Sequence, residues 1–196
     1  MIVNAEFYFI PNWREQWTQD GKDKFKGRFK AQIEKIWSGS NVRLYPNSKE
    51  CPCADKGFKP KMLVNTSEGG TTATKGTMHF DVRSYIARSE SEQIDDGDLD
   101  PLPLEGGLSP HVGAAHEVGH RLGLSHPGWS LWRALGAANN NEGAYMKVGK
   151  DWWGHDVNGP DDLMGKGGGM RPFYFDQWGK KLNENYKNCC EYAPRN

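Results

Sequence analysis

The sequence predicts a single α+β domain in which helices pack on a mixed, twisted sheet. Its 196 residues suit one domain that buries its own core. The segment VNAEFYFI at 3–10 has the composition of a strand, and the apolar residues of 20–37 recur at helical spacing. Several strand-like segments then precede a second helix, an order that suits a sheet covered by helices.

The other elements follow from local patterns. The apolar face of the 20–37 helix is expected to consist of Phe25, Phe29, Ile33, Ile36 and Trp37. Short strands are expected at 41–46, 61–66 and 76–86, and a last helix at 173–186. Because residues 127–172 have no regular pattern, we expect an N-terminal lobe of about 1–126 and an irregular C-terminal lobe of about 127–196 that ends in the last helix.

The second helix has its own start and stop signals. Ser109 and Pro110 predict its beginning, because serine caps helices and proline suits the first helical position. The helix is expected to run to about Leu122, and Gly123 is expected to end it in a left-handed conformation.

This helix carries the sequence AAHEVGHRLGLSHPG, residues 114–128. His116 and His120 are four residues apart, so both imidazoles lie on one helical face and can reach one metal ion. Glu117 lies at the edge of that face, and Gly123 lets the chain turn so that His126 supplies a third ligand. Three protein ligands leave the fourth position of a tetrahedral zinc ion for water, as in catalytic zinc sites.

The pattern is specific for a sequence of this composition. With six histidines, twelve glutamates and 24 glycines, it arises by chance with a probability on the order of 4 × 10⁻⁵. The structural alternative is a polar helix whose histidines are satisfied near the surface.

His116, Glu117, His120, Gly123 and His126 match the long zinc motif of the metzincin-clan metallopeptidases, and the chain resembles that clan. The resemblance implies a metzincin-like catalytic domain and a methionine turn beneath the zinc. DDLMGKGG at 161–168 is similar to that turn and makes Met164 its methionine, with Met146 and Met170 as weaker candidates.

Two further resemblances refine this one. LGLSHPG is similar to the serralysins, but Lys166 stands where those enzymes carry a zinc-binding tyrosine, and their calcium-binding glycine repeats do not follow. The segment DLMGKGGGMRPFYFDQW resembles the ends of metallopeptidase domains of bacterial polymorphic toxins. This second likeness implies a secreted or delivered bacterial toxin with an inhibitor or immunity protein as a partner.

The expected reaction is cleavage of internal peptide bonds by a zinc-bound water that Glu117 activates as general base. Tyr145, His155 and Tyr174 are candidate oxyanion donors, whereas His79 and His111 are expected to be structural. The alternatives are a zinc amidase that acts on cell-wall peptides and a non-catalytic zinc-dependent binding module. An intact Glu117 argues against the binding module, because a binder needs no general base.

Peptidases hold extended substrates, and an exposed strand edge is a suitable holder. We expect Gly76–Tyr85 to be that edge, with Thr77, His79 and Asp81 toward the substrate side. Met78, Phe80 and Val82 would then face the core. The alternative is that this segment is a buried central strand.

The four cysteines predict cross-links between the Cys51/Cys53 loop and Cys189/Cys190, which would place the protein in an oxidising compartment. Free thiols and a four-thiolate zinc site are the alternatives. We therefore expect an extracellular protein or one delivered outside the producing cell. The segment MIVNAEFYFIPNW has strand rather than signal-peptide character, so export would use a larger precursor, a processed fragment or a leaderless route.

Charge and hydropathy limit the kinds of partner that the sequence allows. Basic and acidic residues number 25 each, which argues against nucleic acid or an anionic membrane as the main partner. No apolar run is long enough for a transmembrane helix. We expect a monomer that acts on a peptide or protein substrate. The acids at 95, 96, 98 and 100 could hold calcium, although most acidic runs are only solvated.

Overall fold

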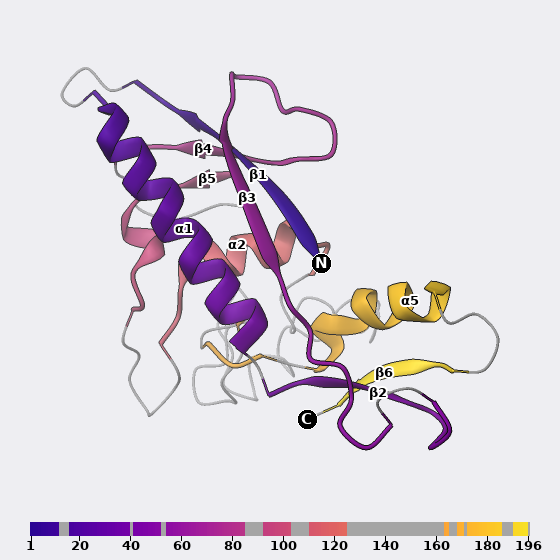
Figure 1. Cartoon of the computed structure of the whole chain (residues 1–196). Helices are drawn as coiled ribbons and strands as arrows, with labels where there is room; N and C mark the ends of the chain where they lie inside the picture. The colour runs from indigo at the N-terminus through magenta and orange to yellow at the C-terminus, as the bar shows by residue number, and fades with distance from the viewer. Residues whose placement is uncertain are drawn as a thin grey trace, which may run out of the picture.

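The computed structural model describes residues 1–11, 16–39, 41–51, 54–84, 92–102, 110–124, 163–164, 168–170, 172–185 and 190–195. Its elements, in chain order, are β1 (Ile2–Phe9), α1 (Gln19–Gly39), β2 (Arg43–Pro46), β3 (Leu63–Glu68), β4 (Met78–Val82), β5 (Gln93–Ile94), η1 (Gly97–Leu99), α2 (Gly113–Arg121), η4 (Pro172–Phe175), α5 (Asp176–Asn185) and β6 (Tyr192–Arg195). Helices pack on two separate sheets, which confirms the α+β class (Figure 1).

The larger sheet has the strand order β3-β1-β4-β5, and all its described pairings are parallel. The expectation of a mixed sheet is therefore wrong for these strands. The antiparallel pairing lies in the second sheet, where β2 of the N-terminal half pairs with β6 near the C-terminus.

The core between β1 and α1 follows the predicted patterns. Phe7 and Phe9 lie on the buried side of β1, because alternate residues of a strand share a face. The Phe7 ring makes T-shaped contacts with Phe25 and Phe29 of α1 at centroid distances of 5.5 and 4.9 Å. In the part of the chain that the structure describes, no helix has the length and apolar character needed to cross a membrane.

Helix α1 also protects the outer edge of β3. The Val64 N–H donates to Glu34 Oε1 at 2.8 Å, and the Met62 N–H donates to Ser38 Oγ at 2.9 Å. Unpaired strand edges can pair with other chains, so these side chains stabilise the edge and reduce its capacity to add a strand.

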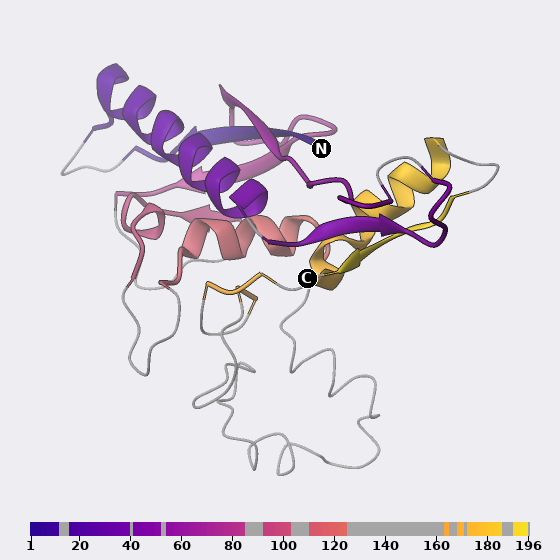
Figure 2. The same cartoon turned by 60° about the horizontal axis from the view of Figure 1, so that its bottom comes forward.

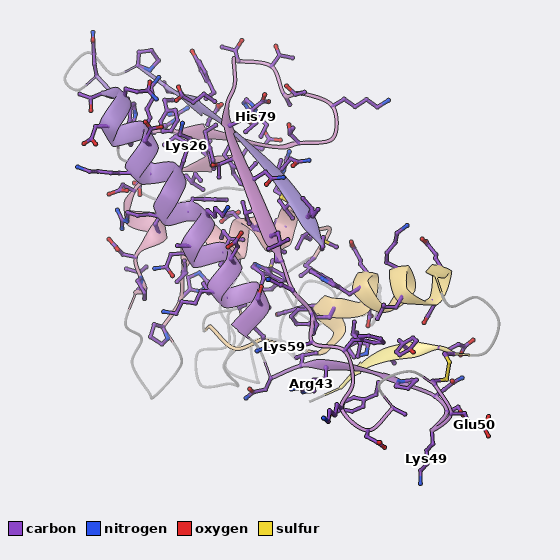
Figure 3. The ribbon with its side chains drawn as sticks, viewed as in Figure 1. Lys26, Arg43, Lys49, Glu50, Lys59 and His79 are labelled. Carbon is purple, nitrogen blue, oxygen red and sulfur yellow. A yellow bond between two sulfur atoms is a disulfide. The ribbon has the colours of Figure 1, made fainter. Side chains whose placement is uncertain are left out.

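The C-terminal segment is attached to the N-terminal half of the chain. Figure 2 shows β2 and β6 side by side next to α5, and Cys51 is joined to Cys190 by a disulfide (Figure 3). This is one of the predicted cross-links; Cys53 and Cys189 lie outside the described residues. β2 and Phe58, which we expected in the N-terminal lobe, pack against β6 near the C-terminus.

Replacing Cys51 and Cys190 together by serine should lower the free energy of unfolding by up to about 5 kcal/mol in the chain-entropy model. The cross-link spans 139 residues, so its removal gives the unfolded chain much more freedom. Urea unfolding of the oxidised proteins measures the difference. Four reactive thiols in the unfolded, unreduced wild type would show that no cross-link exists.

Glu68, at the end of β3, is a charged anchor for the first turns of α1. Its carboxylate accepts hydrogen bonds of 2.9 Å from Gln19, Lys22 and Lys26. Hydrogen bonds from Gln19, Lys26 and Lys22, in that order of importance, lower the pKa of Glu68 to about 2.

Glu68→Gln should lower the free energy of unfolding near neutral pH by about 1 kcal/mol, the upper end for exposed ion pairs. The folded-state pKa lies below the ordinary value of 4.5, so this contribution is complete above pH 4.5 and is lost as the pH falls toward about 2. Urea unfolding at several pH values should show the difference from wild type shrinking over that range. The exposed Glu50→Gln is the control (Figure 3). A difference that stays constant down to pH 2 contradicts the assignment.

Candidate metal centre

Helix α2 begins later than the sequence predicts. Its N-cap is Val112, with φ −117° and ψ 107°, and Pro110 lies before the helix. The reason is an antiparallel bridge: the Leu102 N–H donates to the His111 carbonyl at 2.7 Å, and the His111 N–H donates back at 3.1 Å. This pairing keeps the chain extended up to Val112. His111 therefore lies before the helix, and not in the first turn where a start at Ser109 and Pro110 would place it. Ser109, the predicted cap, lies outside the described residues.

The first turn of α2 is buried, and small side chains make this possible. Gly113, Ala114 and Ala115 are all buried. A Cβ at Gly113 would lie 2.7 Å from Asp98 Oδ1, so this carboxylate approaches the N-terminus of the helix closely. Negative charge is favourable there, because the first N–H groups of a helix carry partial positive charge.

The C-terminus of α2 ends as predicted, and the way it ends positions His120. Gly123 has φ 87°, its N–H donates to the His120 carbonyl, and the Leu124 N–H donates to the Gly119 carbonyl. This pair of bonds is a Schellman motif, which folds the chain back over the last turn. The Leu124 carbonyl consequently meets His120 Nδ1 at 2.9 Å.

His116 is held in the same manner, by a segment far away in the sequence. Its Nδ1 lies 2.8 Å from the Leu163 carbonyl, and its ring centroid is 4.7 Å from that of His120. A carbonyl oxygen only accepts hydrogen bonds, so each Nδ1 carries the proton and the lone pair of each neutral ring is on Nε2. Metal-binding histidines are typically oriented by such a bond from the other ring nitrogen.

Glu117, the predicted general base, is also buried on α2, with 5% of its surface exposed. It directly follows His116 in the helix, so its backbone is as rigidly placed as that of the histidine pair.

Met164 lies beneath the histidine helix. Its side chain is fully buried, and a Cβ added at Gly119 would overlap Met164 Sδ. Gly119 therefore allows the methionine to pack against the helix backbone between His116 and His120. Of the weaker candidates for this position, Met170 is only partly buried and Met146 lies outside the described residues.

The predicted zinc ligands are described only in part. Within the described ranges, no three His, Cys, Asp or Glu side chains form a group that could hold a metal ion. His116 and His120 supply two imidazoles, and His126 lies outside these ranges, as do Tyr145 and His155. Two imidazoles with Nδ1 protonated and Nε2 as the donor fit a zinc ion, which binds histidine nitrogen readily.

His111 lies beside the histidine pair. Its ring centroid is 5.3 Å from that of His116, at an interplanar angle of 61°. The bridge to Leu102 fixes its backbone, so His111 belongs to the wall around the candidate site.

Tyr174 does not fit the role of oxyanion donor. It is buried, and its Oη accepts a hydrogen bond of 3.2 Å from the Met164 N–H. Its hydroxyl therefore supports the turn at Leu163 and Met164, beneath the helix that carries the histidines.

The predicted substrate edge is covered only in part. β4 pairs with β1 along Met78–Val82, and on its other side β5 pairs with Asp81 and Val82 alone. The open-edge prediction is therefore wrong at Asp81, whereas the described β5 pairing does not extend to Thr77 and His79. His79 instead lies 3.5 Å from Glu6 and 3.3 Å from Asp81 (Figure 3). Glu6 is buried, and hydrogen bonds from the Thr74 side chain and backbone lower its pKa. The group is a polar cluster on the face of the sheet opposite Phe7, because neighbouring residues of a strand point to opposite faces. These contacts support the expectation that His79 is structural.

The acids proposed for calcium have protein partners. Asp95 Oδ1 accepts from the Gly97 N–H at 2.7 Å, and Asp96 and Asp100 each lie 2.6 Å from the Arg28 guanidinium. These contacts connect η1 to α1 and support a structural role for the acids.

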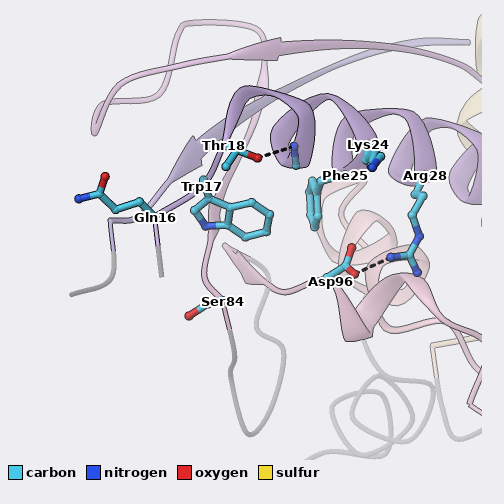
Figure 4. A pocket seen from close by; sticks show the side chains of 9 residues that line it. Gln16, Trp17, Thr18, Lys24, Phe25, Arg28, Ser84 and Asp96 are labelled. Carbon is cyan, nitrogen blue, oxygen red and sulfur yellow. Dashed lines mark hydrogen bonds and ion pairs between the residues drawn. The ribbon is translucent and has the colours of Figure 1, made fainter. Parts of the chain in front are cut away.

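A pocket of about 570 Å³ opens at the first turns of α1 (Figure 4). Trp17 and Phe25 form its apolar wall, and Arg28 pairs with Asp96 at its side. None of its described lining residues belongs to α2 or to the methionine turn. We therefore assign it no part in the chemistry of the histidine site.

The sequence did not reveal three features that shape the site. These are the carbonyls of Leu163 and Leu124, which orient the histidines, and the close approach of Met164 to Gly119. A signal was present for the last: glycine inside a short helix is unfavourable unless something packs closely against it. No sequence signal marks the two carbonyls, because every residue has a backbone carbonyl.

No family model matches the chain, and comparisons with curated proteins and with solved structures find no match either. The assignment of function consequently depends on the residues of the site.

Gly119→Ala should lower the free energy of unfolding by about 1–3 kcal/mol, because the added methyl group must displace Met164. Gly27→Ala is the matched control in α1, where an added Cβ meets nothing within 4 Å. That variant should gain about 0.5–1 kcal/mol, since alanine is the better helix former. Urea unfolding measures both changes, and a Gly119→Ala variant as stable as wild type would rule out the close packing.

Proposed function

We propose that this chain is a zinc-dependent endopeptidase with a metzincin-like catalytic site. The observation that carries the proposal is the arrangement of His116 and His120, one helical turn apart, with each Nδ1 bonded to a backbone carbonyl. That arrangement presents both Nε2 atoms as metal ligands. His126 is the proposed third ligand, and Met164 supports the pair from below.

The proposed chemistry divides between metal and protein. Bound zinc would polarise the scissile carbonyl and make water acidic enough to attack it. Glu117 would accept the water proton on a carboxylate oxygen and donate it to the nitrogen of the departing amine. The water oxygen forms a new bond to the carbonyl carbon, and the carbon–nitrogen bond then breaks. The products are a carboxylic acid and an amine.

We also propose that the enzyme acts outside a reducing cytosol, as a secreted or delivered protein of the toxin type. The Cys51–Cys190 disulfide supports this, because such cross-links persist in oxidising compartments.

Glu117→Gln should keep zinc and lose nearly all hydrolysis, because the side chain is a base and not a ligand. His120→Ala should lose both, and His79→Ala, outside the site, should keep zinc. Metal analysis after dialysis gives the zinc content, and digestion of a peptide library with and without chelator gives the activity. Near-normal cleavage by Glu117→Gln would refute the mechanism. Undiminished zinc in His120→Ala would refute the site.

A further inference from the structure

The peptide group that joins Leu163 to Met164 is held at both of its polar ends. Its carbonyl oxygen accepts the hydrogen bond from His116 Nδ1 at 2.8 Å. Its N–H, formally that of Met164, donates to Tyr174 Oη at 3.2 Å. Tyr174 and His116 are therefore the two hydrogen-bond partners of one planar unit.

The planarity of this group couples its two partners mechanically. The C=O and N–H of a trans peptide point in opposite directions and turn together, because rotation about the bond between them is strongly hindered. Tyr174 is itself fixed by burial, with its ring centroid 6.3 Å from that of Trp37. A fixed hydroxyl on one side of the peptide consequently limits where the Leu163 carbonyl can point on the other.

The same arrangement couples the partners electronically. Hydrogen bonds in a chain polarise one another. When Tyr174 Oη accepts a hydrogen bond from the Met164 N–H, the Leu163 carbonyl therefore becomes a better acceptor for His116 Nδ1–H. A stronger bond at Nδ1 raises the basicity of Nε2, as carboxylate partners do in other metal sites.

We propose that Tyr174 is a positioning residue for the metal centre, which acts on His116 through the Leu163–Met164 peptide group. The inference rests on the proposed function in one respect, namely that His116 Nε2 binds zinc. Tyr174 does not touch substrate or metal in this role. Its effect is on the direction and strength of one ligand, so His120, which is held by the Leu124 carbonyl, should be unaffected.

The test compares Tyr174→Phe with Tyr192→Phe, which removes another buried tyrosine hydroxyl, in β6. Long-range ¹H–¹⁵N NMR of the metal-free proteins reports the proton on each imidazole nitrogen. Competition with a chelator gives the zinc affinity. We expect Tyr174→Phe to shift the His116 Nδ1 proton upfield, because its hydrogen bond becomes weaker, and to leave the His120 signals unchanged. The variant should bind zinc about 10-fold more weakly than wild type. Tyr192→Phe should match wild type in both measurements.

Unchanged His116 signals in a folded Tyr174→Phe protein would overturn the inference, as would equal changes in both variants. If Tyr174→Phe does not fold, 3-fluorotyrosine at position 174 keeps the shape and weakens the acceptor oxygen. An upfield shift of the His116 Nδ1 proton would then support the coupling, and no shift would overturn it. Failure of the proposed function is recognised separately, because wild type would then bind no zinc while the imidazole signals still report on Tyr174.

Discussion

The peptide group between Leu163 and Met164 is the constraint on which the geometry of the candidate site depends. It orients His116 through its carbonyl, and the methionine that follows packs against the helix at Gly119. Neither contact is local, since the turn comes more than forty residues after α2 in the sequence. The helix sets the spacing of the histidines, and the turn sets the direction of the first imidazole.

The turn is itself held by the C-terminal elements. Tyr174 belongs to an aromatic cluster. The ring centroid of Trp37 of α1 lies 6.3 Å from that of Tyr174, and Trp37 stacks on Trp178 of α5 at 6.2 Å. The β2–β6 pairing and the Cys51–Cys190 cross-link attach the same region to the N-terminal half of the chain. Long-range packing thus reaches the helix of His116 and His120 from outside it.

Local patterns in the sequence predicted what is local in the structure. Three such features were predicted, because each depends on a short stretch of sequence. They are the apolar spacing of α1, the left-handed Gly123 and the one-turn separation of His116 and His120. The start of α2 was not, because the bridge between Leu102 and His111 overrides the helix signals before it. The position of β4 inside the sheet also depends on pairing with β1 and β5, which no single segment encodes.

The central claim is that His116 and His120 bind one zinc ion through Nε2 while their Nδ1 protons remain bonded to backbone carbonyls. Zinc titration of the wild-type chain, followed by long-range ¹H–¹⁵N NMR of the imidazoles, tests it most directly. The account predicts saturation at one equivalent, with both Nε2 signals shifting together and both Nδ1 atoms still protonated. Binding through either Nδ1, or no saturable shift at all, would contradict it.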